Sequence, residues 1–139
     1  MTSAFENLAR LDKALKPEPP DAKEFAGLVG SGQRRLRDAR HEGLSLEGRF
    51  DLAYNAAHAL CLAALRWHGY RSANRFLVFQ LLPHTLGLGP EVWRVLAKCH
   101  ELRNHGEYEG NLDVDQRIVA DLIAACEKVA AEVGELAPI

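Results

Sequence analysis

The sequence predicts an all-α fold, an antiparallel up-and-down bundle of four to six helices. Three observations favour this fold class. Serine or aspartate repeatedly stands three residues before glutamate or glutamine, a pattern that caps helix N-termini. Apolar residues recur every three or four positions, as one face of a helix requires. No segment alternates apolar and polar residues between hairpin turns, so no strand is predicted.

The first 19 residues are predicted to form a helix and a proline-rich link. Ser3 with Glu6 resembles a capping box, and the helical spacing of apolar residues continues to about Leu15. Prolines follow at three positions, Pro17, Pro19 and Pro20. They should end the helix, because proline lacks a backbone donor and clashes with the preceding turn.

Residues 20–139 are predicted to form the bundle, which begins with a helix from about 21 to 41. Asp21 with Glu24 is a second capping box at its start. Glycines at three positions weaken the middle of this helix, so we expect a kink or break near Gly30.

The third and fourth helices are expected at about 46–68 and 74–86. Ser45 can cap the third, and its many alanines should let neighbouring helices approach closely. Pro83 lies inside the fourth and should kink it or end it early.

The last two helices are expected at about 90–105 and 114–134. Pro90 suits the first position of the former, and Gly106 should end it. Asp113, three residues before Gln116, should open the latter.

Length and composition indicate one globular domain. The chain has 139 residues, of which 47% are hydrophobic and 26% are charged, and its net charge is −2. This composition is typical of a folded protein with a single core. The near-neutral charge means that any site for nucleic acid must be a local basic surface.

We expect a cytoplasmic protein with no membrane association. No apolar run reaches the roughly 20 residues that cross a bilayer. The chain does not open with a basic segment followed by an apolar one, so no secretory signal is predicted. The cysteines, Cys61, Cys99 and Cys126, stand apart among apolar residues and are interpreted as buried side chains in a reducing compartment.

No metal or cofactor is predicted. The sequence has no Cys-x-x-Cys motif, and its six histidines never fall four positions apart. No glycine-rich loop carries the lysine of a nucleotide cradle. His58 lies in an apolar stretch and is interpreted as a hydrogen-bonded residue of the core or of a groove.

A polar stretch, residues 97–110, is the strongest candidate for function. His100, Arg103, Asn104 and Glu107 fall at i, i+3, i+4 and i+7, so a helix would project them together, with Tyr108 at the border of the same stripe. Such a face suits a ligand groove, and it equally suits a solvated helix end.

A second polar feature is a basic patch in the helix expected at 21–41. Its members are Arg34, Arg35, Arg37 and Arg40. Arg66, Arg71 and Arg75 flank the turn between the third and fourth helices. Either group could hold the phosphates of a polyanion, because the arginine fork matches phosphate oxygens. A solvated face with carboxylate partners is the alternative.

These residues resemble the HEPN superfamily of helical, nucleotide-associated domains. The resemblance rests on Leu102-Arg103-Asn104 followed by Glu107-Tyr108-Glu109, and on the aromatic and alanine pattern of residues 50–58. It covers about residues 20–134. It implies an antiparallel bundle that commonly forms a homodimer around one cleft.

The resemblance also implies two activities. In HEPN ribonucleases, which need no metal, an arginine steadies the scissile phosphate and a histidine a few residues later moves a proton. Arg103 and Asn104 match that motif, but Tyr108 occupies the histidine position. His100 or His105 would then have to substitute. Relatives with this variant resemble non-catalytic binders or partners of small nucleotidyltransferases.

Three hypotheses follow. The favoured one is a HEPN-like module, associated with a toxin–antitoxin or nucleotidyltransferase system, that binds a nucleotide, RNA or a partner protein such as an antitoxin. Its ligand-binding residues would be Arg103, Asn104, Glu107 and Tyr108, with Tyr54 and His58 across the groove. The second is a toxin-like ribonuclease in which Arg103 acts with His100 or His105. The third is a structural protein with an internal Arg103–Glu107–Tyr108 network.

Overall fold

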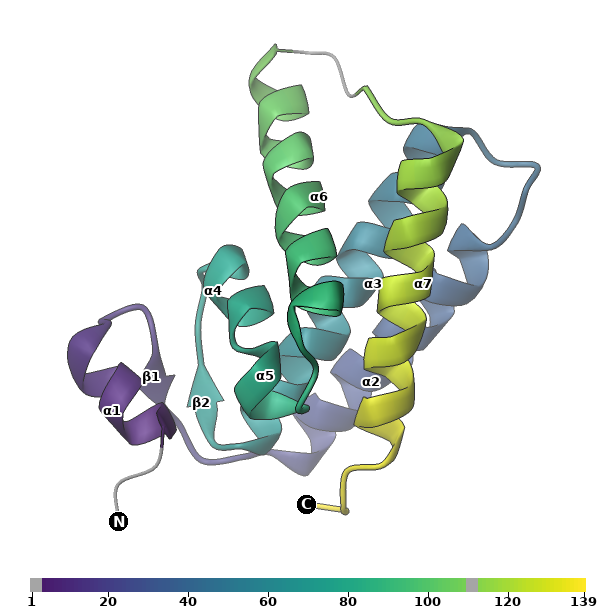
Figure 1. Ribbon diagram of the computed structural model, residues 1–139. Helices are drawn as coiled ribbons and strands as arrows, with labels where there is room; N and C mark the ends of the chain where they lie inside the picture. The colour runs from purple at the N-terminus through teal and green to yellow at the C-terminus, as the bar shows by residue number, and fades with distance from the viewer. Residues whose placement is uncertain (1–3, 110–112) are drawn as a thin grey trace.

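Four long helices form an up-and-down bundle in the computed structural model of the chain, which confirms the predicted all-α fold (Figure 1). The structure describes residues 4–109 and 113–139, and only the backbone in 107–109. The long helices are α2 (Ala22–Ala39), α3 (Leu46–Trp67), α6 (Pro90–Glu109) and α7 (Gln116–Gly134). Three short helices accompany them, α1 (Ala4–Leu11), α4 (Arg75–Gln80) and α5 (Leu82–Thr85).

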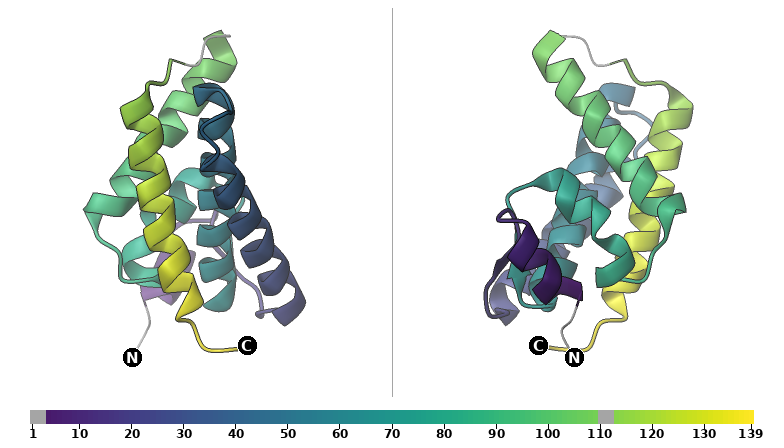
Figure 2. Two further views of the ribbon diagram at one scale, coloured as in Figure 1. Left: turned by 90° about the vertical axis from the view of Figure 1, so that its right-hand side faces the viewer. Right: turned by 60° about the vertical axis from the view of Figure 1, so that its left-hand side comes forward.

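The central element of the bundle is α3, which contacts α2, α6 and α7. The left view of Figure 2 shows α2 and α7 flanking it. Alanines on several sides of α3 are closed to solvent, among them Ala53, Ala56, Ala57 and Ala64. Small side chains on a buried helix let its neighbours approach from several directions, as the alanine content predicted.

The helix starts follow local capping chemistry. Asp21 accepts a hydrogen bond from the Glu24 backbone N–H at 2.9 Å, and Ser45 accepts one from Gly48 at 3.0 Å, as predicted. The predicted start of the last helix is wrong by two residues, because the capping residue is Asp115, whose carboxylate accepts from the Ile118 N–H at 2.8 Å.

Three other predicted boundaries need correction. The second helix runs unbroken through Gly30, and α6 continues through Gly106 to Glu109. A single glycine costs a helix only about 1 kcal/mol, which tertiary packing can offset. The first helix ends at Leu11, and its predicted cap, Ser3, lies outside the described residues. The helix around Pro83 divides into α4 and α5, as the proline predicted.

The expected buried cysteines are confirmed. Cys61, Cys99 and Cys126 are all buried and form no disulfide. Burial raises the pKa of Cys99 to about 11 and that of Cys126 to about 12, so both remain neutral thiols. Among the described helices, none has the length and apolar character needed to cross a membrane.

The contact between α2 and α3 depends on Gly32. A Cβ atom at this position would lie 2.6 Å from Leu60 Cγ and 3.2 Å from the Ala56 carbonyl oxygen. Real side chains do not approach so closely, so only glycine permits the observed separation of the two helices. Gly27, five residues earlier on α2, has nothing within 4 Å of the equivalent position.

We therefore expect Gly32→Ala and Gly27→Ala to change stability in opposite directions. Gly32→Ala should destabilise the fold by about 1–3 kcal/mol through overpacking. Gly27→Ala should stabilise it by about 0.5–1 kcal/mol, because alanine loses less backbone entropy in an open helical position. Urea unfolding monitored by circular dichroism measures both, and equal effects would contradict the close approach at Gly32.

A short antiparallel ladder, which the sequence did not predict, ties the N-terminal segment to the bundle. In it, β1 (Lys16–Pro17) pairs with β2 (Tyr70–Arg71), with Lys16 opposite Arg71. Two residues per strand are too few to produce an alternating pattern. The ladder lies outside the helical core, beside α1 and α4 (Figure 1).

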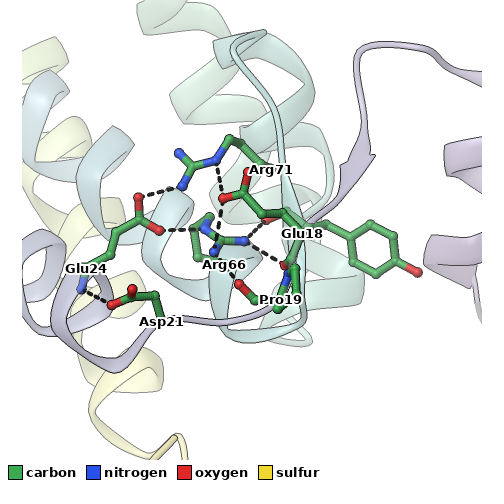
Figure 3. Close-up of polar contacts among 7 residues, drawn as sticks. Glu18, Pro19, Asp21, Glu24, Arg66 and Arg71 are labelled. Carbon is green, nitrogen blue, oxygen red and sulfur yellow. Dashed lines mark hydrogen bonds and ion pairs between the residues drawn. The ribbon is translucent and has the colours of Figure 1, made fainter.

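The buried guanidinium of Arg66 holds this segment in place. Arg66 is 1% exposed and donates to the carbonyl oxygens of Glu18 at 2.9 Å and Pro19 at 2.7 Å. Its Nε donates to Glu24 Oε1 at 2.6 Å, and Arg71 donates to the other oxygen of that carboxylate at 2.5 Å (Figure 3). The expectation that Arg66 could hold an external phosphate is wrong, because its donors are directed into the fold.

The same network acts on Glu24. Hydrogen bonds from Arg71 and then from Arg66 hold the pKa of the Glu24 carboxyl below its ordinary value. An apolar contact adds to the anchor, since the Phe5 ring of α1 stacks on Tyr70 at 5.1 Å between centroids and lies 4.8 Å from the His68 ring.

Removing Arg66 should be far more damaging than removing Arg71. Arg66→Ala should cost about 3–5 kcal/mol, because it leaves a carboxylate and several carbonyl groups without their buried donor. Arg71→Ala should cost about 1 kcal/mol or less, because that side chain is 39% exposed. Urea unfolding compares the two, and equal losses would show that burial does not set the strength of this network.

Candidate functional site

The candidate site is centred on Tyr54, in the middle of α3. The side chain is 1% exposed, and its ring lies 6.4 Å from Phe50 and 5.9 Å from Phe79 of α4 between centroids. These aromatic contacts hold the ring rigidly, and its hydroxyl reaches His100 of α6. A residue from the central helix thus connects two other helices.

His100 uses both of its ring nitrogens in hydrogen bonds. Its Nδ1 lies 2.7 Å from Tyr54 Oη, and its Nε2 lies 3.1 Å from Asn104 Nδ2. With the amide N–H donating to Nε2, Nδ1 carries the proton and donates to the tyrosine oxygen. Burial, assisted by the positive charges of Arg75 and Arg103, lowers the pKa of His100. His100 is therefore a neutral, tightly held imidazole at pH 7.

Two guanidinium groups lie against the Tyr54 ring. The Arg103 guanidinium carbon is 4.9 Å from the ring centroid, and that of Arg75 is 5.5 Å away, both within cation–π range. Arg75 also donates to Asn55 Oδ1 at 3.2 Å. Asp51 Oδ1 lies 3.9 Å from Arg103 Nε, and the Asp51 side chain is 61% exposed, so this ion pair offsets little charge.

His58, one turn after Tyr54 on α3, lies beside this cluster. Its ring is edge-on to Phe79 at 6.2 Å between centroids. Its Nε2 is buried and has no hydrogen-bond partner within the described part of the chain. Burial, then the charge of Arg75, lowers the pKa of His58 to about 4. The expectation of a hydrogen-bonded histidine is therefore wrong for Nε2.

Most of the predicted catalytic and ligand-binding residues that the structure describes meet around Tyr54, and His105 does not. Tyr54 meets His100 and Arg103, and Asn104 joins through His100. His105 is exposed on another face of α6, beside a cavity of about 320 Å³ that Lys98, Glu101 and Leu102 also line. It is not part of the cluster around Tyr54.

Two predicted residues, Glu107 and Tyr108, have side chains outside the described residues. Their helical backbone is described, so α6 extends to their positions. The hypothesis of an internal network with Arg103 depends on these two side chains and stays a prediction. Arg103 itself is not sealed in the fold, because its side chain is 25% exposed.

The predicted basic patch lies on α2 and its C-cap residue, with all four arginines exposed: Arg34, Arg35, Arg37 and Arg40. Two of them have local partners. Arg40 lies 3.6 Å from Glu127 of α7, and Arg35 donates to the Ser31 hydroxyl at 2.8 Å. No contact between described residues joins this patch to the Tyr54 cluster.

Sequence analysis missed the role of Arg75, Asp51 and Asn55. Arg75 was counted only among the cations of the turn before α4, because nothing in the sequence indicates that α4 packs against α6. Asp51 lies one turn before Tyr54 on α3, so helical spacing from Tyr54 could have found it, and Asn55 lies one turn after Asp51.

Comparisons with protein-family models, curated proteins and solved structures find no match to this chain. The relationship to the HEPN superfamily therefore stays a prediction. Within the described residues, no group of three or more histidine, cysteine, aspartate or glutamate side chains could hold a metal ion.

The chemistry of the cluster suits anion binding better than proton transfer. Two guanidinium groups provide several N–H donors beside a rigid aromatic ring. His100 is neutral, but hydrogen bonds occupy both of its nitrogens, so proton transfer would require one of them to break.

His58 should stay neutral until the pH falls to about 4. The unfolded chain would protonate this residue near 6.5, so stability should fall by up to about 3 kcal/mol as the pH drops from 6.5 to 4. His58→Gln should remove this part of the pH dependence, whereas His41→Gln, at an exposed position, should not. NMR titration checks the assignment, and a His58 midpoint near 6.5 would contradict it.

Proposed function

We propose that this protein is a HEPN-like, non-catalytic module that binds a phosphate-bearing ligand, a nucleotide or an RNA segment, beside Tyr54. One observation carries the proposal. Arg75 of α4 and Arg103 of α6 direct guanidinium groups at the same ring, next to a neutral His100. Both guanidinium carbons lie within 5.5 Å of the same ring centroid, so a phosphate bound beside that ring would be attracted to each of them.

A metal-independent ribonuclease is the second candidate. It is favoured by the neutral His100 three residues before Arg103, because a neutral imidazole can accept a proton from a ribose hydroxyl. The two hydrogen bonds of His100 count against it. A homodimer, and an antitoxin or small nucleotidyltransferase as partner, remain predictions of the HEPN resemblance alone.

The test is binding of a fluorescently labelled single-stranded RNA and of a nucleoside monophosphate at several salt concentrations. Arg75→Ala and Arg103→Ala should each weaken binding about tenfold, because each removes a charged donor. Each should also reduce the slope of log K against log salt by about one for RNA. Arg94→Ala, an exposed arginine of the same α6, is the matched control.

Other outcomes separate the alternatives. RNA cleavage by the wild type that His100→Ala abolishes would replace the binding module with the ribonuclease. Absence of binding, together with a large loss of thermal stability in Arg103→Ala, would favour the internal network. Loss of RNA binding in Arg37→Ala, with Arg103→Ala unaffected, would move the site to the basic patch on α2.

A further inference from the structure

A second basic site lies where the N-terminal segment meets the turn before α4. A cavity of about 540 Å³ is bordered there by two chain segments, 13–16 and 71–74. Its lining residues are Lys13, Ala14, Lys16, Arg71, Ser72, Ala73 and Asn74. Three of these are cations and none is a carboxylate, so the walls carry one sign of charge.

The β1–β2 ladder forces two of these cations together. Lys16 lies directly opposite Arg71 in the antiparallel register, an arrangement in which like charges destabilise the pair. Glu18 and Glu24 bind Arg71 through its Nε and one terminal nitrogen, Nη2. The structure gives Lys16 and Lys13 no ion pair with any residue it describes.

Donors for an anion remain available in the cavity. The second terminal nitrogen of Arg71, Nη1, has no hydrogen-bond partner in the described part of the chain. Ser72 is 5% exposed, and its Oγ accepts from the Asn74 backbone N–H at 3.0 Å, which leaves its own hydroxyl proton to donate. Lysine, arginine and serine together form a donor set that suits phosphate oxygens.

We propose that this cavity is an anion site that binds a phosphate group, either free or carried by a small molecule of mononucleotide size. The volume lies in the usual range for small-molecule sites, about 300–1,000 Å³. A doubly charged anion would supply a counter-ion for Lys13 and Lys16, which have no ion pair within the described part of the chain. The cavity shares no lining residue with the Tyr54 cluster, and its evidence does not depend on the function proposed there.

The test is thermal unfolding with inorganic phosphate or a nucleoside monophosphate, with sodium chloride added to keep the ionic strength constant. At ten times its Kd, the ligand should raise the Tm by about 3–5 °C in the wild type. Lys16→Ala and Lys13→Ala should lose most of this rise. Lys128→Ala, an exposed lysine of α7, should keep it.

The anion-free proteins provide a second measurement. Without phosphate, Lys16→Ala should have a Tm equal to or above that of the wild type, because it removes a like-charge pair. A larger response to the nucleotide that Lys16→Ala removes identifies a phosphorylated small molecule as the ligand of this cavity, and an equal response identifies free phosphate. If Lys16→Ala and Lys128→Ala respond equally to both anions, the proposal is overturned.

Discussion

The buried guanidinium of Arg66 is the interaction on which the N-terminal half of the structure depends. It reaches from the end of α3 to the carbonyl groups of residues 18 and 19 and to the carboxylate of Glu24. These contacts set the path of the chain from β1 into α2. The β1–β2 register follows from that path, and so does the cavity between the two segments.

The arginine that anchors the N-terminal segment and the arginines of the candidate site have different environments. Arg66 is enclosed, with Glu24 at 2.6 Å, and a cation so placed contributes to the architecture. Arg75 and Arg103 lie instead against an aromatic ring, and Asp51 Oδ1 lies 3.9 Å from Arg103 Nε. Depth of burial therefore distinguishes Arg66, whose side chain is 2% exposed, from Arg103, whose side chain is 25% exposed.

The histidines next to the candidate site are kept neutral by their surroundings. Burial is the largest cause of the lowered pKa for both His58 and His100, and the nearby guanidinium groups add to it. An anion bound to Arg75 and Arg103 would cancel part of that electrostatic effect. Under the proposed function, anion binding and the proton affinity of these imidazoles would be linked through the same two arginines.

The amino-acid sequence by itself determined the features that depend on residues only a few positions apart. Helix starts at Asp21 and Ser45 follow from hydrogen bonds to a residue three positions away, and the buried cysteines follow from local apolar pattern. The shared face of His100, Arg103 and Asn104 follows from helical spacing. The pattern of their own helix also identified Tyr54 and His58 as candidate site residues, but it did not identify the residues that they contact.

Only the tertiary structure decided which distant groups meet. Arg66 forms a hydrogen bond with Glu24, which is 42 positions away in the sequence, and Tyr54 forms one with His100, which is 46 positions away. Lys16 lies opposite Arg71 only because the N-terminal segment folds back on the bundle. Such pairings depend on how helices pack, and a helix presents the same residues to any neighbour, so its periodicity cannot identify the partner.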